Sequence, residues 1–102
     1  MGACSFIDFK AAPTAREAFD ALVAEAEWEH GHDPYNGTIS TTRLMRGHVV
    51  RVADEWREDV RELAIIEADA NGWGEKWEAR AIDCGATGDG LRMWAFYGWA
   101  AC

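Results

Sequence analysis

The stretch that most constrains the fold is the C-terminal run "LRMWAFYGWA", residues 91–100, which places four aromatic side chains within six residues. Its apolar and aromatic composition is typical of a buried β-strand. Side chains alternate across a strand, so Tyr97 and Trp99 would lie on one side and Trp94 and Phe96 on the other. We expect one side to face the core, and the other either to be buried too or to offer large rings to a partner.

Two more segments show strand composition. "EARAIDC", residues 78–84, precedes the aromatic run, and the glycines of "GATGDG", residues 85–90, suit a hairpin between them. "CSFIDFKA", residues 4–11, alternates apolar and polar side chains until Pro13 ends the pattern. We therefore predict three strands in these segments.

Two helices are expected from their end residues. "TARE" is a capping box, in which Thr14 accepts a hydrogen bond from the amide of Glu17, and Gly31 provides a left-handed stop. Asp54 is a good cap for a second helix, which we expect to end at residues 71–72, Asn-Gly. The apolar face of that second helix would consist of Trp56, Val60, Leu63 and Ala64.

Between the helices, the β-branched residues of 38–52 indicate a β-hairpin. The predicted order is then strand, helix, strand, strand, helix, strand, strand. We predict a single α+β domain over residues 1–102, with a mainly antiparallel sheet of four to five strands and two helices on one face. The specific expectation is a ferredoxin-like core.

"EHGHDPYNG", residues 29–37, contains the best metal-ligand types in the chain, namely His30, His32 and Asp33, which His48 or Cys84 could complete only through the fold. Gly31 and Pro34 break any regular element that would align the two imidazoles. We therefore interpret the stretch as a helix stop and strand entry, and keep a small metal-dependent enzyme or ligand-binding protein as the alternative.

Catalytic and cofactor motifs are absent from the sequence. There is no Gly-x-Ser-x-Gly elbow, and the glycines of residues 85–90 lack the lysine of a phosphate loop. We predict no cofactor and a binding protein rather than an enzyme.

The charge balance restricts the class of partner. Ten basic and eighteen acidic residues give a net charge of −8, which repels phosphate backbones and favours a partner with a basic surface. Residues 35–52 are the exception, because they carry Arg43, Arg46 and Arg51 with no acid. A nucleic-acid-binding module that uses these arginines is the second alternative.

Three cysteines, Cys4, Cys84 and Cys102, are odd in number and far apart in the chain. Their arrangement argues against a disulfide framework and favours a reducing cytoplasm. No secretory h-region and no apolar run of membrane-spanning length is present, so no membrane association is expected.

The chain resembles a group of small proteins from actinobacteria and their bacteriophages that share a Tyr-x-Gly-Thr-Ile turn, a Lys-Trp step and a Phe-x-Gly-Trp-Ala ending. The matching residues are Tyr35, Gly37, Thr38, Ile39, Lys76, Trp77, Phe96, Gly98, Trp99 and Ala100. The chain departs from the group at "KWEARA", residues 76–81, where Lys-Trp-Gly-Pro-Ala is the pattern. The resemblance implies a phage or mobile-element setting in the host cytoplasm, and no chemistry.

These observations lead to one main hypothesis: an acidic accessory protein that binds a host or defence protein, as anti-CRISPR and antirestriction inhibitors do. The expected contact residues are acids that face a basic groove and aromatic anchors, namely Glu25, Glu27, Glu29, Glu55, Asp59, Glu62, Trp94 and Trp99.

Overall fold

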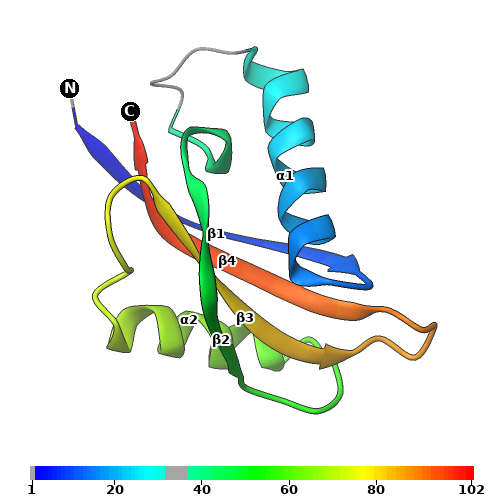
Figure 1. Cartoon of the computed structure of the whole chain (residues 1–102). Coiled ribbons are helices and arrows are strands. Elements are labelled where there is room, and N and C mark those ends of the chain that lie inside the picture. The colour runs from blue at the N-terminus through cyan, green and yellow to red at the C-terminus, as the bar shows by residue number, and fades with distance from the viewer. Residues whose placement is uncertain (1, 32–36) are drawn as a thin grey trace.

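The computed structural model describes residues 2–31 and 37–102, and within residues 46–48 it describes the main chain alone. Two α-helices and a short 3-10 helix accompany a sheet (Figure 1). The elements in chain order are β1 (Ala3–Ala12), α1 (Ala15–His30), η1 (Ile39–Thr41), β2 (Arg43–Arg51), α2 (Val60–Ala70), β3 (Glu78–Ala86) and β4 (Arg92–Ala101).

The described strands form one four-stranded sheet in the order β1-β4-β3-β2. β4 is antiparallel to both of its neighbours, whereas β2 and β3 are parallel. The predicted α+β class with a mainly antiparallel sheet is confirmed. The order β-α-β-α-β-β nevertheless differs from the β-α-β-β-α-β order of the ferredoxin-like expectation.

The two helices cover opposite faces of the sheet, contrary to the prediction that they share one face (Figure 1). Phe19 and Leu22 of α1 pack with Phe96, whereas Val60 of α2 packs with Tyr97, the next residue of β4. The crossover from β1 to β2 runs across the sheet in one direction, and the crossover from β2 to β3 runs back. Two crossovers of the same hand therefore place their helices on opposite faces.

The predicted hairpin over residues 38–52 is wrong. The Thr38 hydroxyl accepts a hydrogen bond from the amide of Ser40, and the amide of Thr42 donates to Ile39 O, so the segment starts with the 3-10 turn η1. Only β2 follows, and it pairs with β3 rather than with a strand of its own segment.

The helix ends are set largely as predicted. Thr14 caps α1 by accepting from the amide of Glu17 at 3.2 Å, and Gly31 ends the helix with φ 69°. α2 ends at Ala70 with Asn71 as its C-cap, as expected from the stop at residues 71–72, but it begins at Val60 rather than after Asp54. The main chain around Asp54 pairs with the end of β3 instead, because the amide of Ala86 donates to Asp54 O and the amide of Trp56 donates to Ala86 O, both at 2.9 Å.

Candidate protein-interaction surface

The six acidic residues predicted to bind a partner fall into two separate groups. Glu25, Glu27 and Glu29 lie in the last turns of α1, whereas Glu55, Asp59 and Glu62 lie just before and within α2. Because α1 and α2 cover opposite faces of the sheet, one flat basic surface cannot contact both groups. The predicted residues therefore divide into two alternative surfaces.

The outer side of α2 combines these acids with exposed aliphatic side chains. Val60, Ala64 and Ala68 face the sheet, so the residues on the far side of the helix point to solvent. There Ile66 is 63% exposed and Leu63 is 44% exposed. We define the α2 patch as this aliphatic pair and the acids on the same side of the helix. Its residues are Asp59, Glu62, Leu63, Ile66 and Asp69.

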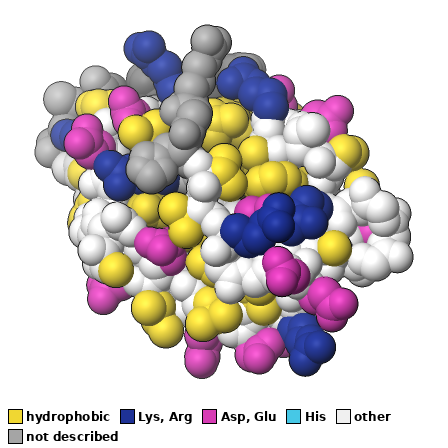
Figure 2. Space-filling model, turned by 60° about the horizontal axis from the view of Figure 1, so that its bottom comes forward, with side chains coloured by type: hydrophobic (Ala, Val, Ile, Leu, Met, Phe, Trp, Pro, Cys, Tyr) yellow, Lys and Arg dark blue, Asp and Glu magenta, His cyan; other side chains and the backbone are white. Residues whose placement is uncertain are grey.

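Figure 2 brings forward the side of the molecule on which α2 lies in Figure 1, and shows hydrophobic side chains at the surface with Asp and Glu side chains between them. The prediction had placed Leu63 in the core-facing stripe, which is wrong: Leu63 is exposed, whereas Val60 and Ala64 of the same predicted stripe are buried. On a helical wheel Leu63 lies one turn after Val60, at the edge of the buried stripe, and Ile66 lies on the far side.

The acids of the α2 patch are not neutralised from within the molecule. The two nearby arginines are already engaged: Arg57 pairs with Glu55 at 3.6 Å, and Arg61 pairs with Glu58 at 3.2 Å. Arg61 also lies over the rings of Phe9 and Trp56. Among the described residues, no side-chain hydrogen bond or ion pair involves the carboxylates of Asp59, Glu62 and Asp69. The patch therefore carries uncompensated negative charge around an apolar centre.

The aromatic anchors lie elsewhere than predicted. Trp94 is only 8% exposed, and its indole donates to Ala12 O at 3.0 Å, so it belongs to the core. Trp99 is half-buried and donates to Gly72 O at 3.2 Å. The most exposed tryptophan among the described residues is Trp28, at 91%, on the solvent side of α1. Its position opposite Phe19 and Leu22 on a helical wheel could have indicated this.

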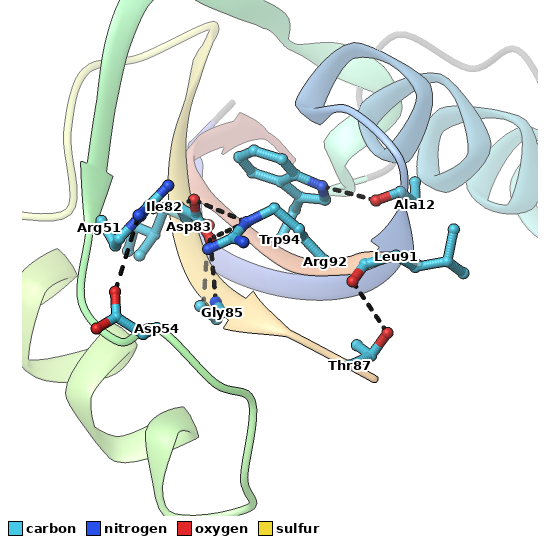
Figure 3. Close-up of polar contacts among 11 residues, drawn as sticks. Ala12, Arg51, Asp54, Ile82, Asp83, Gly85, Thr87, Leu91, Arg92 and Trp94 are labelled. Atoms are coloured by element: carbon cyan, nitrogen blue, oxygen red, sulfur yellow. Dashed lines mark hydrogen bonds and ion pairs between the residues drawn. The ribbon is translucent and has the colours of Figure 1, made fainter. Parts of the chain in front are cut away.

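A buried carboxylate network joins three strand ends near the hairpin of β3 and β4 (Figure 3). Asp83 is 4% exposed. Its carboxylate accepts hydrogen bonds from Arg92 of β4 and Arg51 of β2, with Nε–O distances of 3.0 and 3.2 Å. The amide of Gly85 also donates to Asp83 at 3.0 Å. With its oxygens occupied by partners from its own chain, Asp83 acts as a structural tie between strands.

The histidine stretch offers no metal site in the part of the chain that the structure describes. His32 and Asp33 lie outside the described residues, as does the side chain of His48. His30 lies at a hollow of about 170 Å³ that is also lined by Asp8 and Glu25. Among the described side chains, no group of three or more His, Cys, Asp or Glu is arranged to hold a metal ion.

Burial beneath α1, with a smaller contribution from nearby Glu25, raises the pKa of Asp8 above its ordinary value of 3.8. Cys84 is fully buried, and desolvation followed by the charge of Asp83 raises its pKa to about 12. A thiol with so high a pKa is a poor nucleophile at neutral pH, so Cys84 is a core residue.

The sequence argued against a disulfide framework, but two of the three cysteines are paired. Cys4 and Cys102 form a disulfide, and Cys84 is free. The antiparallel register of β1 and β4 brings the two ends of the chain together, with Ala3 opposite Ala101. The 98 residues between the two cysteines hide this proximity in the sequence.

Comparison of the chain with protein-family models, curated proteins and solved structures gave no match. Within residues 2–31 and 37–102, no helix is both long enough and apolar enough to cross a membrane.

Proposed function

We propose that this chain is a non-enzymatic binding protein whose α2 patch docks on a surface of a partner protein that has basic side chains around an apolar centre. The observation that carries the proposal is the exposure of Ile66 and Leu63 between the unpaired acids Glu62 and Asp69. An apolar centre ringed by charge is the usual composition of a protein interface.

Apolar burial and charge complementarity at the α2 patch can together account for binding of a partner. Burying an exposed isoleucine or leucine side chain fully contributes about 1.5 to 3 kcal/mol, so the aliphatic pair can form the centre of an interface. Charge complementarity at the rim mainly raises the association rate and excludes partners of the wrong sign. The net charge of −8 extends this steering over the whole molecule.

The class of partner that we propose is a host or defence protein, as an anti-CRISPR or antirestriction inhibitor would bind. The support is the resemblance to small actinobacterial and phage proteins, together with an acidic surface that suits a groove built for nucleic acid. The location that we propose with this partner class is the host cytoplasm, where thiol reductants act on disulfides.

The experiment compares two neighbouring isoleucines. Ile65 and Ile66 are both exposed, at 41% and 63%, but only Ile66 belongs to the α2 patch. A partner retained from host lysate by the wild-type chain is purified, and its affinity is measured for the wild type, Ile66→Ser and Ile65→Ser. We expect Ile66→Ser to weaken binding by about ten-fold and Ile65→Ser to leave it nearly unchanged.

A second arm tests the charge and the alternative surface. Asp59→Lys with Glu62→Lys should weaken binding, and added salt should weaken the wild-type complex. Trp28→Ala reports on the α1 side. Loss of binding in Trp28→Ala with full binding in Ile66→Ser would move the interface to α1, and the absence of any retained partner would contradict the proposal.

A further inference from the structure

Among the described strands β2 lies at an edge of the sheet, and no described helix covers part of the face beside it. α1 packs mainly on β1, β4 and η1, and from β2 Leu44 joins this core (Figure 1). Val49 of β2 is therefore 51% exposed, although valine is a typical core residue of a strand. This area lies across the sheet from the α2 patch.

The surface beside β2 is hollowed at Leu44. One hollow of about 480 Å³ lies between β2 and the start of α1 and is lined by Ala15, Leu44, Val49 and Ala81. A second hollow of about 590 Å³ is lined by Leu44, Met45 and Trp77. Leu44 belongs to both, so the two hollows flank one strand. We call this surface the β2 groove.

The charge of the β2 groove is opposite to that of the molecule. Arg43, Lys76 and Arg16, which pairs with Asp20 at 3.2 Å, line its hollows, and Glu78 is the acid among the lining residues. Arg43 is exposed, and no ion pair joins it to another described side chain. In a chain of net charge −8, this is a local concentration of cations on an apolar floor.

We propose that the β2 groove binds an extended segment of a partner protein in which apolar and acidic residues alternate, and that this segment adds to the sheet as a fifth strand beside β2. Such strand addition uses main-chain hydrogen bonds for affinity and pockets for alternate side chains for specificity. The cations supply the preference for acidic residues.

The main-chain geometry of β2 identifies which amides would bind the segment. The amide of Val52 donates a hydrogen bond to Asp83 O at 3.0 Å, so this amide points toward β3. Successive amides alternate along a strand, so the amide of Val50 also points toward β3 and those of Val49 and Arg51 point away. These outward amides lie at the edge where a new strand would pair.

A second copy of β2 is a poor occupant for the same edge. Residues 35–52 contain arginines and no acid, so two copies of β2 would bring together strands of the same charge. Like charges opposite one another destabilise a strand pair, and basic edge strands discourage self-association. The same charges attract an acidic strand.

The test uses an end-capped nine-residue peptide of alternating valine and glutamate, and the same peptide with lysine in place of glutamate. Binding is measured by titration calorimetry, and amide hydrogen exchange is followed by NMR. We expect only the glutamate peptide to bind, and to slow exchange at Val49 and Arg51 by about ten-fold, whereas Val50 is already bonded and changes little.

Two matched pairs of variants complete the test. Val49→Pro removes an outward amide, whereas Val49→Thr keeps it, so the proline variant should lose about ten-fold more affinity. Arg43→Glu should weaken binding by a similar factor, while Arg57→Glu, on the α2 side, should not. If Val49→Pro fails to fold, the comparison of Arg43→Glu with Arg57→Glu and the hydrogen-exchange data still test the proposal.

Equal binding of the lysine peptide, unchanged exchange at Val49 and Arg51, or no binding of the glutamate peptide at millimolar concentration would overturn the proposal. A dimer detected by sedimentation that Val49→Pro dissociates would also overturn it, because a second copy would then occupy the edge.

Discussion

The guanidinium of Arg92 contacts both carboxylate oxygens of Asp83, with Nε–O distances of 3.0 Å to each. Arg92 begins β4 and Asp83 lies near the end of β3, so this pair closes the hairpin end of the sheet where the strand register shifts. Arg51 adds a contact from β2. The tie thus joins three strands.

Replacing Asp83 by Ala should lower the free energy of unfolding by about 1 to 3 kcal/mol, because two arginines lose their shared acceptor and the amide of Gly85 loses its partner. Urea denaturation measures the loss. Asp54→Ala is the control, since Asp54 is 90% exposed and 3.8 Å from Arg51, and should change stability by less than about 0.5 kcal/mol. Similar losses in both variants would contradict a buried tie.

Gly37→Val should cost about 1 to 3 kcal/mol, because residue 37 has φ 74° and an added Cβ would lie 3.3 Å from that of Cys102. Gly31 has a similar φ of 69° with open space around it, so Gly31→Val isolates the backbone strain and should cost less. Chemical denaturation compares the two. His30→Gln should cost less than about 1 kcal/mol, and a larger loss there would indicate a site instead of a helix stop.

Removing the disulfide by Cys4→Ser should lower the free energy of unfolding by about 2 to 4 kcal/mol, because the bond closes nearly the whole chain in the unfolded state. The variant should stay folded, since β1 and β4 remain paired from Ala3 to Ala12. Thiol titration of the denatured wild type should give one thiol before reduction and three after it. Three thiols without reductant would exclude the bond.

Asp8→Asn should stabilise the protein at neutral pH. The raised pKa of Asp8 means that the folded state binds this proton more tightly than the unfolded chain, so ionised Asp8 opposes folding above that pKa. The opposition disappears as the pH falls below 3.8, where both states are protonated. Thermal unfolding of Asp8→Asn and wild type should therefore differ at pH 7 and converge at low pH. A constant difference would exclude titration of Asp8, and Asp59→Asn serves as the surface control.

Prediction from the sequence worked best where neighbouring residues decide the structure. Thr14 and Glu17 lie three residues apart, and their hydrogen bond forms as soon as the helix starts. The strands at both ends of the chain and the turn between β3 and β4 were likewise predicted. Asp54 does not cap a helix, because its carbonyl oxygen accepts a hydrogen bond from the amide of Ala86, 32 residues later, at the end of β3.

The candidate surface was only partly predictable, because exposure depends on which face of an element is covered. Asp59 and Glu62 remain predicted contact residues, whereas Leu63 was expected in the core and is exposed. Trp94 was expected to be an exposed anchor but packs beneath α1, whereas Trp28, for which no environment was predicted, faces away from the sheet. Trp28 lies opposite the buried Phe19 and Leu22 of α1, so its exposure follows from the register of the buried stripe of that helix.

The sequence by itself determined the α+β class, the helix ends at Thr14, Gly31 and Asn71, and the acidic charge, because capping, backbone freedom and ionisation depend on residues close in the chain. The tertiary structure alone decided the order β1-β4-β3-β2, the helices on opposite faces, the Cys4–Cys102 bond and the open edge of β2. These depend on contacts between residues far apart in the chain, which form when the whole sheet assembles and which no local pattern encodes.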